Sequence, residues 1–302
     1  MHYYASFGLS IASEFEIDEL EPTAAPVAEC DVKIRAATIS DRPRIEAGAP
    51  GRYRATPKET CLAWSGVGGI LVRDGREIIV DAEPGADWGL LRVGLLGAAF
   101  CPLLQQRGIF PLHASVVSLP NEHRTVAFCG ATGAGKSTMA ATLIERGFEL
   151  WADDVAAIKI RALSAQVFAA YPNLKLWPAA LTQLGGRPNE LPRVHFAEEK
   201  RLRRVARAQI TEPSRRLTAI YVLDYDDQVV VDRLDSQAAV VELLRHAYNA
   251  ALQFAALGPA ELFRRVTEVA ARVPVYRLAR PRDLARLREV ADQLAAHAAG
   301  SS

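Results

Sequence analysis

Cysteine is scarce in this sequence and long uncharged apolar runs are missing, and each shortage narrows what the chain can be. Four cysteines, at positions 30, 61, 101 and 129, are spread over 302 residues without a C-x-x-C pair, which argues against a structural zinc site or a disulfide framework. The most apolar stretch, 90–104, contains Arg92 and Pro102, so it predicts a buried helix instead of a membrane span. The first residues lack the basic start and apolar core of a signal peptide. We therefore expect a cytoplasmic protein with no membrane partner.

An excess of charge of either sign is also absent. The chain has 36 Lys and Arg against 35 Asp and Glu, a net charge of +1, so we expect no nucleic-acid partner. The charges are unevenly distributed, because residues 1–100 carry a net charge of −5 and residues 101–302 carry +6. This imbalance suggests two parts with different tasks, a β-rich N-terminal domain over 1–105 and a second domain over 106–302.

The first hundred residues are typical of short strands. Apolar or alternating runs at 3–11, 32–39, 61–64, 70–72 and 78–80 are separated by turn residues, and Asp74-Gly75 between the last two predicts a hairpin. No catalytic motif occurs in this region. We expect a small β domain whose last element is a linking helix over roughly 88–104.

From about residue 108 strands and helices alternate, which predicts an α/β fold. Strands are expected at 112–119, 126–129, 148–152, 155–160, 166–171, 217–223 and 273–278. A helix is expected to follow residue 135 and to end at Gly147, and further helices are expected at 178–184, 236–257, 259–272 and 281–297.

The strongest motif follows the strand at 126–129. Residues 130–137 match G-x-x-x-x-G-K-[ST] in full, and a random match in a chain of this composition is expected only about 0.002 times. In such a loop successive backbone N–H groups surround phosphate oxygens, and the positive end of the following helix adds to the attraction. Lys136 would reach the β- and γ-phosphates of a nucleotide, and Ser137 would bind Mg²⁺. The candidate nucleotide-binding residues are Gly130, Ala131, Thr132, Gly133, Ala134, Gly135, Lys136, Ser137 and Thr138.

Two adjacent carboxylates follow the strand after the loop helix. Asp153 and Asp154 stand where an acidic side chain can hold Mg²⁺ or take a proton from an attacking hydroxyl, although a solvated Asp-Asp turn is the structural alternative. Asp224, at the end of the strand at 217–223, is a rival that reads more simply as a polar strand end. His113 lies on the strand before the loop, where a lone histidine is usually a satisfied core residue.

A basic run occurs between residues 200 and 207, where five of eight residues are Lys or Arg. Such a run is usually a solvated face, but next to a nucleotide site it could neutralise a transferred phosphoryl group. In an extended segment Arg201 and Arg203 share one face and Arg204 lies on the other. Arg201 and Arg203 are therefore the candidate catalytic cations.

Together, His113, the loop at 130–137 and Ala152-Asp153-Asp154 resemble the C-terminal catalytic domain of the HPr kinase/phosphorylase family, in the same order and at similar spacing. The resemblance implies a P-loop kinase domain related to phosphoenolpyruvate carboxykinase, with ATP- and Mg²⁺-dependent transfer of a phosphoryl group to a serine. It places the general base in the aspartate pair, with Asp153 as first choice and Asp154 supporting the metal or the base. It also places His113 near the phosphates and the base.

The sequence departs from the family pattern at two points. Ala114 follows the histidine where the family has glycine, and the stretch 171–178 contains no carboxylate to serve as a second Mg²⁺ ligand. Both the second ligand and a reverse phosphorylase reaction therefore stay open. The N-terminal region does not resemble that of the HPr enzyme.

A divergent set of stand-alone HPr-kinase-like proteins looks more similar. These kinases accompany lasso-peptide biosynthesis and phosphorylate a serine at the C-terminus of a precursor peptide; the similar stretches are 2–20, 171–178 and 273–284. The resemblance implies a peptide or small-protein partner with an acceptor serine. A small-molecule kinase, a nucleotidyltransferase and a nucleotide-sensing module without catalysis remain as alternatives, and a homo-oligomer is left open.

Overall fold

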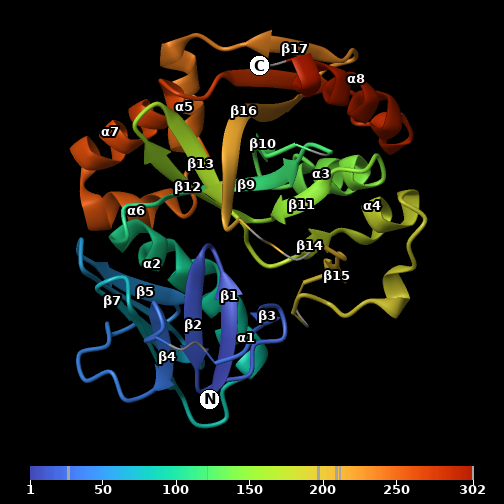
Figure 1. Ribbon diagram of the computed structural model, residues 1–302. Coiled ribbons are helices and arrows are strands. Elements are labelled where there is room, and N and C mark those ends of the chain that lie inside the picture. Colours follow the sequence, from blue (N-terminus) through green and yellow to red (C-terminus); the bar gives the residue numbers. More distant parts are fainter. Residues whose placement is uncertain (26–27, 121, 196–197, 208–209, 211, 301–302) are drawn as a thin grey trace.

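A computed structural model describes residues 1–25, 28–120, 122–195, 198–207, 210 and 212–300. Two large sheets dominate it, and a helical segment lies between them (Figure 1). The first sheet has the strand order β3-β1-β2-β4-β8-β7-β6-β5. Its strands are β1 (His2–Ser6), β2 (Leu9–Ser13), β3 (Glu21–Pro22), β4 (Val32–Ala36), β5 (Gly51–Ala55), β6 (Glu59–Trp64), β7 (Gly68–Arg73) and β8 (Glu77–Ala82).

Two turns shape this first sheet. The hairpin predicted at Asp74-Gly75 is confirmed, since it joins the antiparallel strands β7 and β8 and both residues have positive φ, 51° and 63°. The single strand predicted over 3–11 is wrong. Phe7 and Gly8, with φ of 54° and 70°, make a second tight turn that splits the run into β1 and β2. Glycine carries such a φ without a steric penalty, and Phe7 is held there because its ring is buried.

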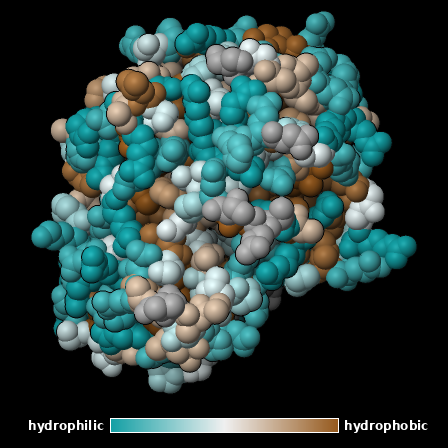
Figure 2. Space-filling model, in the orientation of Figure 1, coloured by the Kyte–Doolittle hydropathy of each residue, from teal (hydrophilic) through white to brown (hydrophobic). Residues whose placement is uncertain are grey.

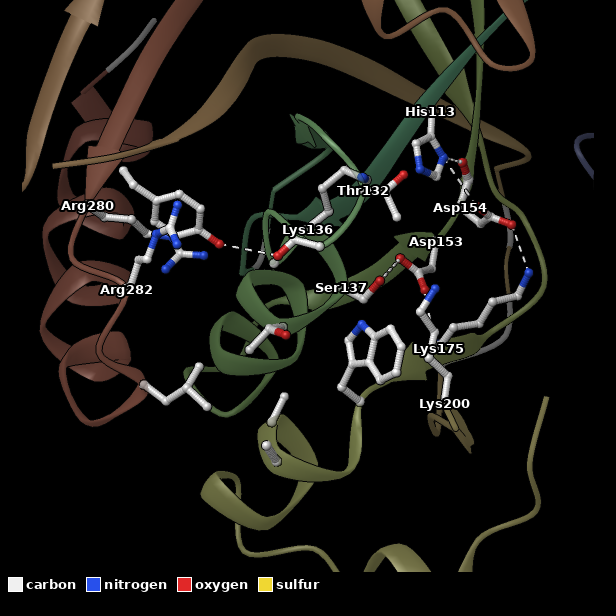
Figure 3. A pocket seen from close by; sticks show the side chains of 18 residues that line it. His113, Thr132, Lys136, Ser137, Asp153, Asp154, Lys175, Lys200, Arg280 and Arg282 are labelled. Carbon is white, nitrogen blue, oxygen red and sulfur yellow. Dashed lines mark hydrogen bonds and ion pairs between the residues drawn. The ribbon is translucent and has the colours of Figure 1, made fainter. Parts of the chain in front are cut away.

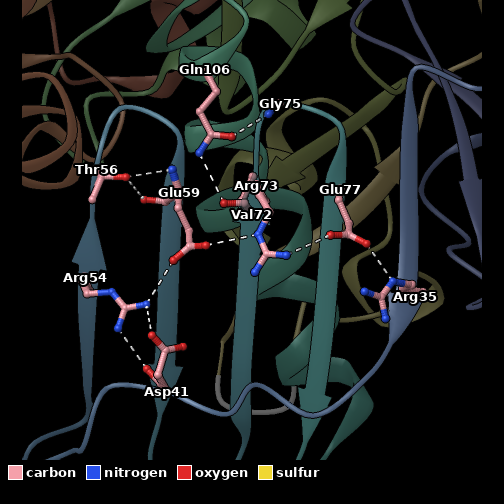
Figure 4. Close-up of polar contacts among 10 residues, drawn as sticks. All are labelled: Arg35, Asp41, Arg54, Thr56, Glu59, Val72, Arg73, Gly75, Glu77 and Gln106. Carbon is pink, nitrogen blue, oxygen red and sulfur yellow. Dashed lines mark hydrogen bonds and ion pairs between the residues drawn. The ribbon is translucent and has the colours of Figure 1, made fainter.

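The outer face of the first sheet carries a charge ladder, made of Arg35, Asp41, Arg54, Glu59, Arg73 and Glu77 (Figure 4). Arg54 pairs with Asp41 at 2.8 Å and with Glu59 at 3.1 Å. Arg73 lies 3.2 Å from Glu59 and 3.7 Å from Glu77, and Arg35 lies 2.8 Å from Glu77. Each of these six charges therefore lies beside at least one opposite charge.

A linker helix connects the two sheets and consists of α1 (Trp88–Gly94), a π-helical turn η1 (Leu95–Ala99) and α2 (Phe100–Gln106). Asp87 caps its start, with a carboxylate oxygen 2.7 Å from the backbone nitrogen of Gly89. In the described part of the chain, Trp88–Gln106 is the one stretch long and apolar enough to cross a membrane, and 61% of it is buried within the protein. The expectation of a buried helix is confirmed. Teal, hydrophilic side chains cover most of the face shown in Figure 2.

The second sheet has the order β10-β9-β12-β13-β16-β18-β17, and β11 pairs with β9. β10 runs parallel to β16, and β16 runs parallel to β18, whereas β9 is antiparallel to its neighbours. A small separate sheet contains β14 and β15. The strands are β9 (Phe110–Ser118), β10 (Arg124–Cys129), β11 (Glu149–Ala152), β12 (Val155–Arg161), β13 (Ser164–Phe168), β14 (Asn173–Leu176), β15 (Arg201–Arg204), β16 (Ser214–Tyr225), β17 (Val230–Arg233) and β18 (Val275–Arg280).

Helices cover both faces of this second sheet. The bounds are α3 (Lys136–Ile144), α4 (Pro178–Gln183), η2 (Pro188–Glu190), α5 (Ser236–Arg245), α6 (Ala250–Leu257), α7 (Pro259–Ala270), η3 (Leu284–Arg286) and α8 (Leu287–Gly300). On β10 the alternation of side chains is clear, because Phe128 packs with α3 and α8 while its neighbour Ala127 packs on the side of α5 to α7. The mixed α/β architecture predicted for this region is confirmed.

The single helix predicted over 236–257 is wrong, because the chain breaks it at residues 246–249. Asn249 has a φ of 49°, which a continuing helix does not allow. The break lets Ala247 form a bridge with Leu112 of β9. A continuous core then joins the two halves, because buried residues of the first sheet, the linker helix and the second sheet belong to one cluster. The boundary expected at 105/106 falls at the end of the linker helix.

Candidate active site at the glycine-rich loop

The loop at 130–137 connects the end of β10 to the start of α3 and depends on three glycines. Gly130, Gly133 and Gly135 have φ of 148°, 84° and 89°, which residues with a Cβ atom rarely adopt. A Cβ atom at Gly135 would also lie 2.5 Å from a guanidinium nitrogen of Arg280. The sequence motif therefore folds as a strand, a loop and a helix, the arrangement typical of phosphate-binding loops.

Three side chains donate hydrogen bonds to the carbonyl groups of this loop. Lys136 Nζ lies 3.0 Å from the oxygen of Gly130 and 3.3 Å from that of Ala131, Tyr225 Oη lies 3.2 Å from that of Gly133, and Arg280 Nη2 lies 2.7 Å from that of Ala134. Because its carbonyl oxygens are engaged, the loop can present its N–H groups, with those of the first turn of α3, to an anion. Burial lowers the pKa of Lys136, and the nearby carboxylates oppose this change.

Asp153 is buried beside the start of α3, with 3% of its surface exposed. Its Oδ1 accepts hydrogen bonds from Ser115 Oγ at 2.6 Å and from Ser137 Oγ at 2.9 Å, and its Oδ2 accepts one from the backbone nitrogen of Lys175 at 3.0 Å. Burial raises the pKa of Asp153, although these hydrogen bonds favour the carboxylate. Asp153 is thus held in place from three sides and tied to the loop serine.

Asp154 faces a different set of groups. Its Oδ2 lies 2.8 Å from Lys175 Nζ, and its Oδ1 lies 3.2 Å from His113 Nδ1. Burial opposes ionisation, but Lys175 and His113 outweigh it and hold the pKa of Asp154 well below its usual range. Because the pKa is lowered, Asp154 stays ionised at neutral and mildly acidic pH. Its φ of 72° is a left-handed conformation that turns the chain between β11 and β12.

His113 is oriented by the backbone as well as by the carboxylate. Its Nδ1 lies 3.0 Å from the carbonyl oxygen of Asp154 and 3.2 Å from Oδ1 of the same residue. Both neighbours are acceptors, so Nδ1 is the ring nitrogen that donates in this arrangement. Ser115, two residues further along β9, points to the same side and contacts Asp153.

These groups line one elongated pocket of about 220 Å³. Figure 3 shows His113, Asp154 and Lys175 at one end, Arg280 and Arg282 at the other, and Lys136 and Ser137 between them. The lining also contains Thr132, Gly133, Gly135, Thr138, Asp153, Trp177, Ala179, Ala180, Lys200, Tyr225 and Leu284. At the arginine end the guanidinium carbon of Arg282 lies 4.4 Å from the centre of the Tyr225 ring.

A second cavity lies across the loop from the first. It measures about 540 Å³, shares His113, Thr132 and Asp154 with the pocket, and is closed by Ala98 and by residues 245–249. A third cavity of about 410 Å³ shares Ala131, Arg245 and His246 with the second. The two neighbouring cavities are together called the groove, and Asp154 lines the second cavity.

The structure brings together most of the residues predicted for the site. His113, Lys136, Ser137, Thr138, Asp153 and Asp154 all line the pocket. Asp224 does not, since it pairs with Arg277 at 2.9 Å and lines the third cavity.

The two candidate arginines of the basic run lie elsewhere. In β15 Leu202 is opposite Lys175 of β14, so Arg201 and Arg203 are on the other face of this small sheet. Arg201 is buried beside the position of Leu176. Lys200, with its Nζ 5.5 Å from the centre of the Trp177 ring, is the cation of the run that lines the pocket.

Sequence reasoning missed Ser115, Lys175, Tyr225, Arg280 and Arg282. Ser115 was accessible from the two-residue period of β9, which puts it on the side of His113. Arg280 and Arg282 had a weaker signal, as two cations directly after the last strand. Lys175 and Tyr225 lie on strands that pair with segments distant in the sequence, and no local sequence pattern predicts these strand pairings.

The donor groups fit a hard divalent cation such as Mg²⁺. Ser137 and Asp153 offer hard oxygen donors 2.9 Å apart next to the loop, and Mg²⁺ usually takes few protein ligands, with phosphates and water completing its shell. Among the described residues no group of three or more His, Cys, Asp or Glu side chains could hold a metal ion. A site of this kind needs the phosphates of a ligand to be complete.

Comparisons with known proteins find similarity among solved structures. No family model matches the chain. No curated protein sequence matches it either. Among solved structures, the HPr(Ser) kinase/phosphatase from Coxiella burnetii aligns with 63% of this chain and 98% of its own, at 13% sequence identity and a TM-score of 0.31.

Proposed function

We propose that the protein is an ATP- and Mg²⁺-dependent kinase that transfers the γ-phosphoryl group to a serine hydroxyl of a peptide or small protein. One observation carries the proposal: Asp154 is ionised and faces both the pocket on one side of the loop and the groove on the other. A phosphoryl donor on one side and an acceptor hydroxyl on the other would meet at this carboxylate. This is the arrangement that in-line transfer needs.

The two ends of the pocket differ in their side chains, and this difference determines how we orient the nucleotide. Its phosphates bind to the N–H groups of the loop and of α3, and Lys136 exchanges its carbonyl partners for phosphate oxygens. Since the carboxylates mark the γ-phosphate end, the base lies at the opposite end, where Figure 3 shows Arg280 and Arg282. There the Tyr225 ring and the Arg282 guanidinium offer flat surfaces on which a purine stacks.

Mg²⁺ would be held by Ser137 and Asp153. When bound, it neutralises charge on the β- and γ-phosphates. Asp153 suits this task because Ser115 and the backbone of Lys175 fix it beside Ser137. The chain thus provides a rigid oxygen pair and leaves the remaining ligands to substrate and water.

The acceptor side is assigned to Asp154. The sequence favours Asp153 as the base, but Asp153 is engaged on both oxygens and tied to the loop serine, so the contacts favour the opposite assignment. Asp154 would accept the hydrogen of the serine hydroxyl, while Lys175 balances its charge and His113 sets its orientation. Lys200 is a further cation of the pocket that can offset charge on the phosphates.

The choice of a polypeptide acceptor follows from the resemblance and not from the size of the groove. Cavities of about 540 and 410 Å³ are of the size that small-molecule ligands also occupy. Following the resemblance, the C-terminal serine of a lasso-peptide precursor is the particular acceptor that we propose to test first.

The experiment is mass spectrometry of candidate peptides after incubation with the protein, ATP and Mg²⁺. Addition of one phosphate to a serine is expected. Addition of a nucleoside monophosphate would identify a nucleotidyltransferase, and phosphorylation of small molecules alone would identify a metabolite kinase. ATP that binds but leaves every acceptor unmodified would replace the proposal by a nucleotide-sensing module.

A further inference from the structure

The linker helix comes close to the active site at Gly97. Gly97 lies in the π-helical turn η1, and a Cβ atom placed on it would be 2.6 Å from the hydroxyl oxygen of Tyr248. Any side chain at position 97 would therefore displace the tyrosine. π-helical turns inside α-helices are frequent near functional sites, and this turn places the backbone of the linker helix against the site.

Tyr248 belongs to the segment that breaks the predicted helix, and this segment is fixed to β9. His113 N donates to the carbonyl oxygen of His246 at 2.8 Å, and Tyr248 N donates to that of Pro111 at 3.0 Å. The buried Gln253 side chain donates to the carbonyl oxygens of Pro111 and Tyr248, at 2.9 Å and 2.7 Å. Residues 246–248 thus follow β9 at the position of His113.

The linker helix is tied to the same segment at two more points. Gln105, which is buried in α2, donates to the carbonyl oxygen of Gln253 at 3.1 Å. Cys101 Sγ lies 3.3 Å from the carbonyl oxygen of Tyr248. With Gly97, these contacts join the linker helix, residues 246–253 and β9 into one buried unit.

The ring of Tyr248 contacts the catalytic histidine. The ring centres of Tyr248 and His113 are 5.6 Å apart, and the planes are close to perpendicular at 66°. Burial holds the pKa of Tyr248 well above its usual value, so the phenol stays neutral and acts by contact. On its other side His113 meets Asp154, at 3.2 Å. The imidazole is therefore held between an aromatic edge and a carboxylate.

We propose that Tyr248 is a positioning residue: seated against Gly97 of the linker helix, its ring fixes the His113 imidazole against Asp154. The N-terminal half of the chain thereby sets the orientation of a catalytic group that it does not itself contain. For its kinetic consequence the inference rests on the proposed kinase function; the contact itself does not.

Gly97→Ala tests the link. The methyl group displaces the Tyr248 ring, so kcat is expected to fall about tenfold or more while the KM for ATP stays within twofold, because small misplacements at a reacting centre are costly. Tyr248→Phe keeps the ring and removes the oxygen that the methyl group meets. The double variant is therefore expected to recover the kcat of Tyr248→Phe alone. In a His113→Ala background Gly97→Ala should have no further effect on kcat.

Two controls separate positioning from stability. Gly94→Ala, in the same helix, places its methyl group 3.1 Å from the Trp64 ring instead of Tyr248, so it should lower the Tm without lowering kcat. Tyr248→Leu keeps a buried apolar side chain but removes the ring, and it should lower kcat even if Gly97→Ala fails to fold.

A measurement without catalysis distinguishes this inference from the proposed function. NMR signals of the His113 imidazole, assigned with His113→Asn, should shift in Gly97→Ala or Tyr248→Leu and return in the Gly97→Ala/Tyr248→Phe double variant. Folded variants with unshifted His113 signals overturn the inference, as does an effect of Gly97→Ala that persists without His113. Shifted signals in a protein without kinase activity would support the contact and reject the kinase.

Discussion

The two halves of the molecule treat charge in opposite ways. On the charge ladder of the first sheet, each arginine lies within 4 Å of at least one carboxylate, and the carboxylates at the centre serve two arginines (Figure 4). In the pocket of the second half, Lys136 and Arg280 donate to backbone carbonyl groups, and within the described ranges neither forms an ion pair with a carboxylate. The charges of the ladder neutralise one another, whereas these two cations of the pocket are not neutralised by a carboxylate within the described ranges.

This difference indicates where a ligand is needed. A buried cation without an anion costs free energy, because water no longer solvates it. The buried Lys136 illustrates this cost, since burial lowers its pKa. A bound polyphosphate would remove the cost, so ligand binding should stabilise the second half strongly. Substitutions in the pocket should therefore change activity and ligand binding strongly, whereas substitutions on the ladder should change only the free energy of unfolding, and by little.

The largest effect is expected for Lys136→Ala. It removes the cation that contacts the phosphates, so phosphoryl transfer should fall below detection and ATP should no longer raise the Tm. Lys33→Ala, on an exposed lysine paired with Glu29, is the matched control and should change neither. A Lys136→Ala protein with full transfer activity would remove the loop from the mechanism.

Next in size are the two aspartates. Asp154→Asn should lower kcat roughly 10²- to 10⁴-fold, the range for a lost general base, without changing the Mg²⁺ concentration needed for half-maximal activity. Asp153→Asn should instead raise that Mg²⁺ concentration. Both variants are compared in steady-state assays over a Mg²⁺ series. If the two patterns are exchanged, Asp153 is the base, as the sequence favoured.

The lowered pKa of Asp154 allows its role to be tested by the pH dependence of kcat. Its pKa is lowered on folding, so its contribution to stability is present above the usual aspartate value and is lost only as the pH falls through the lower, folded value. Protonation of Asp154 should therefore not limit kcat between pH 5 and 8. An acid-side fall of kcat in that window that disappears in Asp154→Asn would contradict this assignment.

A smaller effect is expected at the base end of the pocket. Tyr225→Ala should weaken ATP binding about tenfold, because stacking of a base on an aromatic ring contributes roughly 1–3 kcal/mol. Tyr225→Phe keeps the ring but loses the hydrogen bond to Gly133, which separates stacking from support of the loop. Calorimetry with ATP and with inorganic tripolyphosphate measures both.

Tripolyphosphate is the internal control for this prediction, since it has no base. Its affinity should be unchanged in Tyr225→Ala, and Tyr53→Ala, which truncates an exposed tyrosine of the first sheet, should affect neither ligand. Equal weakening of both ligands in Tyr225→Ala would mean that the tyrosine supports the loop and does not bind the base.

The smallest effect is expected on the charge ladder. Glu59→Gln breaks contacts with Arg54 and Arg73, yet it should lower the free energy of unfolding by about 1 kcal/mol or less, since exposed ion pairs contribute little. Denaturant titration at low and high salt measures this, and salt should reduce the difference. Kinase activity should be unaffected; a loss of activity would connect the ladder to catalysis.

The sequence predicted those features that short segments determine. The loop at 130–137 could be assigned because its glycines, lysine and serine are adjacent, and the hairpin at Asp74-Gly75 because two residues define the turn. The aspartate pair was found for the same reason. The separate roles of Asp153 and Asp154 could not be predicted, because their hydrogen-bond partners come from β9, α3 and β14.

Two of the errors, at residues 236–257 and in the basic run, have the same physical origin, which is tertiary contact overriding local preference. Residues 236–257 are rich in the helix formers Ala and Leu, but hydrogen bonds between residues 246–248 and β9 interrupt the helix. For an extended basic run, Arg201 and Arg203 were expected on one face, and in β15 they do share a face. The register of β15 with β14 nevertheless places both away from the pocket, and Lys200 is the cation of the run that lines it. Register between distant strands cannot be read from one segment.

The parallel pairing of β10 with β16 has a consequence for how the protein is made. Cys129, directly before the loop, pairs with Val222, so the ribosome adds more than 90 residues before this partner exists. At the usual synthesis rates this takes roughly 5–20 s, during which one edge of β10 is open to other strands. A nascent chain released before β16 should therefore depend on chaperones and fail to retain ATP.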